Sequence, residues 1–197
     1  MSKIFYIMGK SATGKDHIYR ALLESKEISV EPLVLYTTRP MREGEENGRE
    51  YWFSNVEELE NLRRSGRIIE ERMYSTVHGP WYYFTADNGQ IRLEETDYLG
   101  IGTLESYLKM REYFGTDRVV PIYVDTEDGI RLERALQRER KQSQPKYAEL
   151  CRRFLADCED FSEEKIKEAE IEYRFFNNGE LSECQEEILT YMKQCVC

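Results

Sequence analysis

The sequence predicts an α/β protein, a three-layer sandwich in which helices cover both faces of a parallel core sheet. Three observations indicate this class. A short apolar run, Ile4–Met8, is typical of a central strand that is buried on both faces. A glycine-rich loop and a helical pattern follow it at once. Further apolar runs then alternate with helical patterns along the 197 residues, which is the order expected of such a sheet.

The elements of the first third are expected as follows. A helix begins near Lys15, because Ile18 and Leu22 recur at helical spacing. A second strand is expected over residues 33–36, followed by a polar functional loop over 41–50 without periodicity. The segment 54–57 (Ser-Asn-Val-Glu) has the capping-box pattern and opens a helix that Gly66 ends.

The middle of the chain predicts a small inserted sheet. Two strand-like pieces, 67–73 and 82–85, are separated by turn material at His78-Gly79-Pro80, which favours an antiparallel pair. The core is expected to resume with strands at 98–102, 119–124 and 173–176, helices at 103–114 and 127–141, and a last helix that contains Ile188. We therefore expect one domain, with a core at 1–35, 98–137 and 156–197 and an insertion at 36–97.

Two arginine-bearing helices flank the breaker-rich segment 142–145, and the second resumes near Lys146. This arrangement suits a mobile helical lid over about residues 138–155. A solvated charged face with glutamate partners gives the same pattern, so the composition leaves both interpretations open.

The formal net charge of −10 argues against a broad surface for nucleic acid or an anionic membrane, because such surfaces need clustered lysine and arginine. A local basic pocket remains compatible with it. The first apolar run is too short for a signal peptide or a membrane span, so we expect a cytoplasmic protein.

The cysteines are odd in number and lack both paired Cys-x-x-Cys spacing and a nearby histidine pair, so a zinc site is not expected. Reduced structural thiols are the expected state. The five positions are Cys151, Cys158, Cys184, Cys195 and Cys197.

The chemistry-bearing motif is Gly9-Lys10-Ser11-Ala12-Thr13-Gly14-Lys15, which matches G-x-x-x-x-G-K, the start of the Walker A phosphate-binding loop. The loop follows a buried strand and opens a helix, so backbone N–H groups can surround an anion and Lys15 can reach the terminal phosphates. With this motif, the expected fold class is a three-layer P-loop NTPase sandwich. The expected ATP-binding residues are Gly9, Lys10, Ser11, Ala12, Thr13, Gly14, Lys15 and Asp16.

Asp16 stands where the Walker A pattern has Ser or Thr, whose hydroxyl binds Mg²⁺. A carboxylate is a hard oxygen ligand that suits Mg²⁺ directly or through water. Asp16 is therefore the expected metal ligand, and Mg²⁺ is the expected cofactor.

A second motif begins at Thr37-Thr38-Arg39 and continues through Arg42, Gly44-Glu45, Gly48 and Tyr51. It resembles the guanylate kinase loop T-T-R-x-x-R-x-G-E-x-x-G-x-x-Y, which binds the phosphate of GMP in that family. Arginine guanidinium groups, which can donate two parallel hydrogen bonds, and a tyrosine hydroxyl are suited to binding such a phosphate. The resemblance implies ATP-dependent phosphorylation of GMP or dGMP to GDP or dGDP by an inserted GMP-binding subdomain under a helical lid.

The same resemblance assigns further residues. Glu70, or Glu71 if the register slips by one, matches the carboxylate that pairs with guanine N1 and N2, and His78 lies where the family has a tyrosine. Arg138 resembles the lid arginine and Arg153 the second arginine after it. The implied catalytic residues are Lys15, Arg138 and Arg153, and the implied GMP-binding residues are Arg39, Arg42, Glu45, Tyr51, Glu70 and His78.

The sequence departs from the family at the base-binding positions. Leu35 replaces a serine, Pro80 ends the segment that matches Tyr-Gly-Ser/Thr, and Gly100 and Gly102 replace paired aspartates. Two other functions therefore stay open: a nucleotide- or peptide-binding module with little turnover, and a P-loop kinase with another phosphorylated acceptor. The expected partners are ATP and GMP, with no nucleic acid or membrane, and the chain is expected to be a monomer or homodimer.

Overall fold

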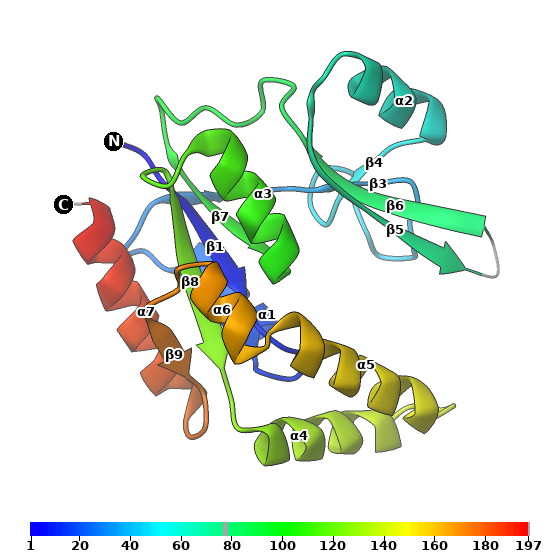
Figure 1. The fold of residues 1–197 in the computed structure, drawn as a ribbon, viewed down its shortest axis with the longest axis vertical. Coiled ribbons are helices and arrows are strands. Elements are labelled where there is room, and N and C mark those ends of the chain that lie inside the picture. The colour runs from blue at the N-terminus through cyan, green and yellow to red at the C-terminus, as the bar shows by residue number, and fades with distance from the viewer. Residues whose placement is uncertain (77–78, 197) are drawn as a thin grey trace.

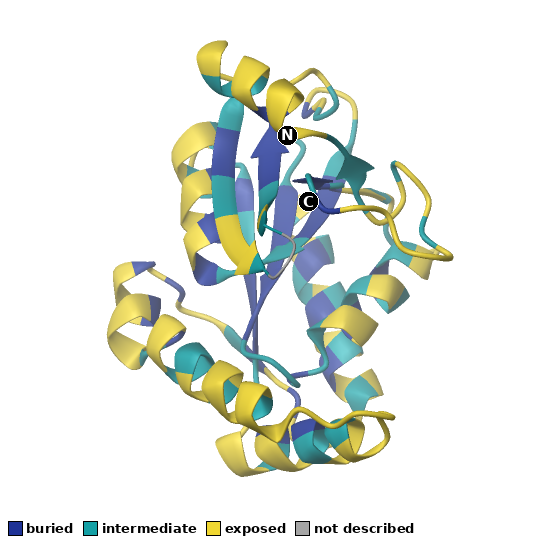
Figure 2. Cartoon of the chain, turned by 90° about the vertical axis from the view of Figure 1, so that its right-hand side faces the viewer, coloured by how far each residue is buried: buried dark blue, intermediate teal, exposed yellow. Residues whose placement is uncertain are grey.

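The computed structural model describes residues 1–76 and 79–196, which form two sheets (Figure 1). The core sheet has the strand order β2-β7-β1-β8-β9, and all its pairs are parallel. Its strands are β1 (Ile4–Met8), β2 (Val30–Pro32), β7 (Asp97–Gly102), β8 (Val119–Asp125) and β9 (Arg174–Phe176). The central strand β1 is buried along its whole length (Figure 2), as an apolar run with helices on both sides requires.

Helices cover both faces of this sheet, so the predicted three-layer α/β sandwich is confirmed. On one face Ile4 and Tyr6 pack with Tyr107 of α3 and Ile166 of α6. On the other face the strands pack with α1 and α7 through Ile18, Leu22, Ile188 and Met192. These helices are α1 (Lys15–Glu24), α3 (Leu104–Phe114), α6 (Glu163–Glu168) and α7 (Leu181–Val196).

The second sheet has the order β4-β3-β6-β5 and lies beside the core (Figure 1). Its long antiparallel pair is β5 with β6. Its own small core contains Tyr36, Leu59, Phe84 and Ala86. The elements are β3 (Tyr36–Thr37), β4 (Trp52–Phe53), β5 (Ile68–Thr76), β6 (Gly79–Ala86) and the covering helix α2 (Val56–Arg64).

The two arginine-bearing helices are α4 (Asp128–Arg140) and α5 (Tyr147–Asp160), which extend together from the core (Figure 1). Arg131 on α4 is fully buried, and its guanidinium lies 4.6 Å from the ring centroid of Phe154 on α5. A buried cation over an aromatic face holds the two helices together. In the part of the chain that the structure describes, no helix is long and apolar enough to cross a membrane, and Cys151, Cys158, Cys184 and Cys195 are free thiols.

Several sequence expectations need correction. The expected strand over 33–36 is wrong, because this segment passes from one sheet to the other. The N–H of Leu33 donates to Leu99 O in the core, whereas Leu35 O accepts from Trp52 N in the second sheet. An apolar run shared between two sheets looks in sequence like one strand.

The expected helix start was wrong by one residue: Asn55 is the N-cap and accepts from Glu58 N at 2.9 Å, while Ser54 Oγ bonds the Glu58 side chain. The expected turn at 78–80 is also wrong in its described part, since Gly79 and Pro80 begin β6. His78 lies outside the described residues. The short helix α6 was not predicted, because one and a half turns carry too little periodicity.

Candidate active site

The glycine-rich loop lies between β1 and α1 at the carboxyl end of the core sheet, and its backbone demands glycine at two places. A Cβ on Gly9 would lie 2.3 Å from Val124 O, and one on Gly14 would lie 2.5 Å from Asn177 Nδ2. Gly14 also has a φ of +88°, which L side chains rarely adopt. The loop is therefore packed closely against β8 and the segment after β9.

The Asn177 side chain holds the glycine-rich loop through a hydrogen bond to its backbone. Its Nδ2 donates to Thr13 O at 2.7 Å, and Thr13 Oγ1 donates to Lys10 O at 3.0 Å. Asn177 is buried, and so is Thr13. The loop is thus rigid before any ligand arrives, as a preformed anion site requires.

Lys15, at the first position of α1, points back over the loop. Its Nζ makes one long hydrogen bond, 3.4 Å, to Lys10 O. Burial lowers the pKa of Lys15, and nearby Arg153 and Arg138 lower it further, while Asp16 and Asp157 oppose the shift. Within the described residues no carboxylate lies within ion-pair distance of its ammonium, so an incoming phosphate would find it available.

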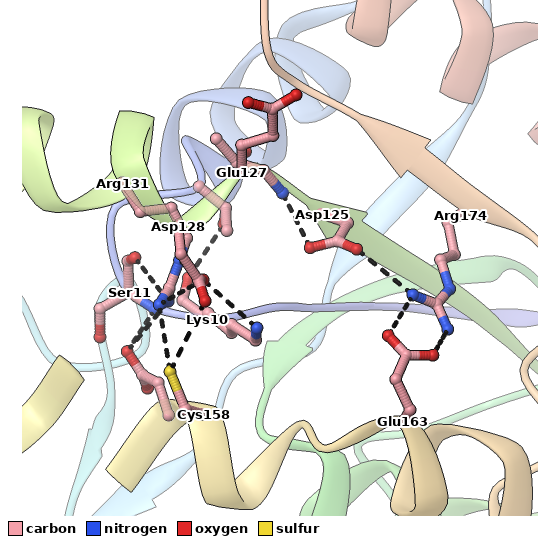
Figure 3. Close-up of polar contacts among 12 residues, drawn as sticks. Lys10, Ser11, Asp125, Glu127, Asp128, Arg131, Cys158, Glu163 and Arg174 are labelled. Carbon is pink, nitrogen blue, oxygen red and sulfur yellow. Dashed lines mark hydrogen bonds and ion pairs between the residues drawn. The ribbon is translucent and has the colours of Figure 1, made fainter. Parts of the chain in front are cut away.

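Asp157 of α5 reaches the loop and was not predicted. Its Oδ2 accepts from Ser11 N at 2.8 Å and lies 3.6 Å from Nη1 of Arg131. Figure 3 shows Arg131 also bonded to Asp128, Ser11 and Cys158. An N–H group of the phosphate-binding loop therefore already holds a carboxylate. No sequence signal marks Asp157, because its role follows from how α5 packs.

The two predicted lid arginines converge on the same loop. Arg153 Nη2 lies 3.4 Å from Ser11 Oγ. Arg138 and Arg153 line a cavity of about 170 Å³ between α4 and α5, together with Ser11 and Asp157. The structure thus brings Lys15, Arg138 and Arg153 into one neighbourhood.

A larger cleft of about 960 Å³ joins the glycine-rich loop to the second sheet. The loop contributes Gly9, Ser11, Lys15 and Asp16 to its lining. The opposite wall contains Tyr51, Arg72, Tyr74, Trp81 and Tyr83. The glycine-rich loop and a largely aromatic wall therefore face a common space of small-molecule size.

Arg39 and Glu45 form a bidentate ion pair in the acceptor loop, with N–O distances of 2.7 and 2.5 Å. Arg39 is only 4% exposed, and its guanidinium lies 5.1 Å from the Tyr51 ring centroid. The hydrogen bonds from Arg39 and from the Arg42 backbone lower the pKa of Glu45 to about 2. Arg42 is exposed. Of the loop residues predicted to bind the acceptor, Tyr51 is the one that lines the cleft.

Glu70 is buried and fully partnered. Its carboxylate accepts from Thr85 Oγ1 at 2.9 Å and pairs with Arg72, whose Nε lies 3.1 Å away. Burial raises the pKa of Glu70, against the opposing effect of Arg72. The fallback, Glu71, pairs instead with Arg63 of α2. Glu70 therefore shares a face of β5 with Arg72, while Glu71 lies on the other face.

Tyr6 occupies the space beside Gly100 and Gly102. A Cβ on Gly102 would lie 2.2 Å from Tyr6 Oη and 2.5 Å from Ser106 Oγ, and one on Gly100 would lie 2.8 Å from the Tyr6 ring. The Tyr6 hydroxyl donates to Ser106 Oγ at 2.8 Å, and burial raises its pKa. The sequence showed Tyr6 only as one more residue of a buried strand.

Asp16 lines the cleft next to Lys15 and is exposed. The described residues contain no group of three or more His, Cys, Asp and Glu side chains that could hold a metal ion. Mg²⁺ in phosphate-transfer sites is commonly held by one or two carboxylates, substrate phosphates and water. A lone Asp16 fits an ion that arrives with a nucleotide.

Comparisons with known proteins agree with this geometry. The family described as Guanylate kinase matches residues 1–92. The guanylate kinase of Porphyromonas gingivalis is 29% identical over 126 residues, which are 63% of this chain and 65% of that protein. That of Baumannia cicadellinicola is 30% identical over 125 residues, 62% of this chain and 56% of the relative. The matched part spans less than two thirds of the length of these curated relatives.

A solved structure extends the likeness to the whole fold. The crystal structure of guanylate kinase from Anaplasma phagocytophilum superposes with a TM-score of 0.64 over 98% of this chain and 86% of that one, at 21% identity. The full-length agreement in fold complements the family match, which covers residues 1–92. The matched domain and these relatives therefore show that the chain resembles guanylate kinases in sequence, and the solved structure shows that it shares their fold.

Proposed function

We propose that this protein transfers the γ-phosphoryl group of ATP to GMP or dGMP and so forms ADP with GDP or dGDP. The observation that carries the proposal is the cleft of about 960 Å³ that joins Lys15 and the glycine-rich loop to Tyr51 and the second sheet. Phosphoryl transfer depends mainly on positioning and charge neutralisation. A shared cleft with cations at the donor end supplies both.

The donor half would bind ATP through the backbone of residues 9–15 and through the Lys15 ammonium. For this, the Asp157 carboxylate must leave Ser11 N–H, because a phosphate oxygen needs the same donor. Arg138 and Arg153 would then neutralise charge that moves between the phosphates. Mg²⁺, held by Asp16 and the nucleotide, would supply further charge neutralisation and alignment of the phosphates.

The acceptor half would hold the GMP phosphate with Arg42, Arg39 and Tyr51. Glu45 keeps Arg39 in a fixed orientation through two hydrogen bonds. Glu70 belongs to the same half, and the contribution of His78 stays a prediction. In this proposal, residues 36–97 form the acceptor-binding insertion and about 138–155 the lid, whose closure would exclude water and suppress ATP hydrolysis.

The test is a coupled ADP-release assay with Mg²⁺-ATP against GMP, dGMP, AMP, CMP and UMP. Selective turnover of GMP and dGMP is the expected result. A Lys26→Ala variant, altered at an exposed lysine after α1, is the control for surface charge. Absence of turnover with every acceptor would refute the proposal, and turnover of AMP alone would refute its choice of substrate.

A further inference from the structure

One face of the β5–β6 pair forms the acceptor wall of the cleft. In the register of these strands Glu70 lies opposite Thr85, Arg72 opposite Tyr83, and Tyr74 opposite Trp81. Side chains two residues apart share a face of a strand, so these pairs form one continuous surface. Arg72, Tyr74, Trp81 and Tyr83 line the cleft. Arg72 is the cation on this otherwise aromatic wall.

Arg72 lies between Glu70 and the cleft. The Glu70 side chain is 2% exposed, and both its oxygens accept hydrogen bonds, Oε1 from Thr85 and Oε2 from Arg72 Nε. The Arg72 side chain is 17% exposed. A molecule in the cleft would therefore meet the Arg72 guanidinium first.

The guanidinium retains donors for a ligand. Nε and Nη2 are directed toward Glu70, at 3.1 and 3.4 Å. Within the described residues Nη1 has no hydrogen-bond partner, and the Nη2 contact is long. A guanidinium has five N–H donors in a fixed plane and no acceptor, so it favours carbonyl oxygens and ring nitrogens over amino groups.

Two positions of the cleft offer no polar side chain to the 2-amino edge of a purine. Leu35 lines the cleft with an apolar side chain, and Gly102 lines it with none. Tyr6 fills the space beside Gly102 with its hydroxyl bonded to Ser106. These two positions hold no carboxylate for N1 and N2, whereas Arg72 has donors that suit the opposite side of the base.

We propose that Arg72 is the specificity-determining residue of the acceptor site and recognises the 6-oxo group and N7 of a purine monophosphate. This inference rests on the proposed function. Guanine presents O6 and N7 as acceptors, whereas adenine presents a donor amino group at C6. Hypoxanthine shares O6 and N7 with guanine and lacks the 2-amino group. The site therefore accepts IMP as well as GMP and rejects AMP.

Glu70 is a positioning residue in this scheme. It holds Nε of Arg72 and is itself fixed by Thr85, so the plane of the guanidinium is set before the base arrives. Removing its charge changes the orientation of Arg72 and leaves the donor site untouched. Its loss therefore raises KM for GMP and leaves KM for ATP unchanged.

The experiment combines turnover with binding. KM and kcat are measured for GMP, IMP and AMP at saturating Mg²⁺-ATP, and the affinity of each monophosphate is measured by calorimetry without ATP. The variants are Arg72→Met, which keeps length but loses all donors, Arg72→Lys, which keeps the charge, and Glu70→Gln. Arg67→Met, an exposed arginine just before β5, is the matched control.

In the wild type, IMP and GMP are expected within about 10-fold of each other, with AMP much weaker. Arg72→Met should reduce the GMP-to-AMP ratio by about 10- to 100-fold, as expected for the loss of a charged hydrogen bond. The GMP-to-AMP ratio of Arg72→Lys should lie between those of Arg72→Met and the wild type, and the ratio of Arg67→Met should equal that of the wild type. Circular dichroism shows that each variant is folded.

The inference is overturned if Arg72→Met and Arg72→Lys leave the GMP-to-AMP ratio unchanged, or if IMP is rejected as strongly as AMP. Binding that discriminates through Arg72 without any turnover would refute the proposed function and keep this inference. Turnover of GMP that is independent of Arg72 would support the proposed function and refute this inference. Absence of binding for all three monophosphates would refute both.

Discussion

The two ends of the cleft differ in how their charged groups are engaged. At the donor end, the Lys15 ammonium makes one 3.4 Å bond to a backbone carbonyl. At the acceptor end, Arg39 is paired with Glu45 and Arg72 with Glu70. The ammonium at the donor end thus has no described carboxylate partner, whereas each of these two arginines at the acceptor end is paired with one.

This difference shows that a sequence motif identifies which charged residues are present. It does not indicate whether their side chains are free to bind a ligand. A buried charge that already has a partner offers a ligand only the donors that this partner leaves free. Availability depends on the surrounding fold.

Lys15→Ala should have the largest effect, because it removes the available cation at the donor end. Loss of one preorganised charge-stabilising donor typically lowers kcat by about 100- to 1000-fold. Steady-state kinetics with Mg²⁺-ATP and GMP measure it, with Lys26→Ala as the control. A loss below about 10-fold would mean that the donor end is not organised around this ammonium.

Arg42→Ala should come next. Arg42 is exposed and its side chain makes no described ion pair, so its guanidinium can bind a phosphate without leaving a partner. Removing a charged hydrogen bond should weaken GMP by about 10- to 100-fold and leave ATP affinity unchanged, by calorimetry with each nucleotide. Arg64→Ala, at an exposed arginine of α2, is the control. Unchanged GMP affinity would remove this loop from the acceptor site.

Gly102→Ala should destabilise the fold where the acceptor end meets the core. Its Cβ would lie 2.2 Å from Tyr6 Oη and 2.5 Å from Ser106 Oγ. Overpacking of this kind costs about 1–3 kcal/mol in the free energy of unfolding, measurable by urea denaturation. Gly129→Ala on α4 is the control, since its Cβ would meet nothing within 4 Å. Equal stability of the two variants would show that Tyr6 does not fill this space.

Asp157→Asn should have the smallest effect and the opposite sign. In the proposed function this carboxylate competes with phosphate for Ser11 N–H, so removing its charge should strengthen ATP binding by roughly 2- to 5-fold, the range of a partly exposed charge interaction. Asp160→Asn removes a charge from the same helix and cleft without touching the loop, and should change affinity less. Weaker ATP binding in Asp157→Asn would show that this carboxylate supports the loop.

Much of the fold was predictable because its signals are local. The buried run of β1, the glycine loop and the helical spacing after Lys15 depend on neighbouring residues alone. The strand over 33–36 was wrong because its residues divide between two sheets, which only tertiary structure determines. The short helix α6 has too few turns to show a period.

The sequence motifs indicated candidate site residues but not how these residues pair with one another. The motifs indicated Lys15 and Arg39. In the structure Lys15 lines the cleft and Arg39 lies in the loop that follows β3. The motifs could not show that Arg39 is bound to Glu45, that Asp157 reaches Ser11 N, or that Arg72 covers Glu70. These contacts join segments up to 146 positions apart, and sequence spacing contains no information about them.

The most direct test of the contrast between the two ends is nuclear magnetic resonance of the arginine side-chain Nε–Hε groups, with Arg39 and Arg72 assigned through lysine variants. Mg²⁺-ATP alone should leave these two signals in place. GMP should shift both, because its phosphate and base add hydrogen bonds to guanidinium groups that Glu45 and Glu70 hold in place. Two signals that GMP leaves unchanged, or that Mg²⁺-ATP alone shifts as strongly as GMP does, would contradict the account.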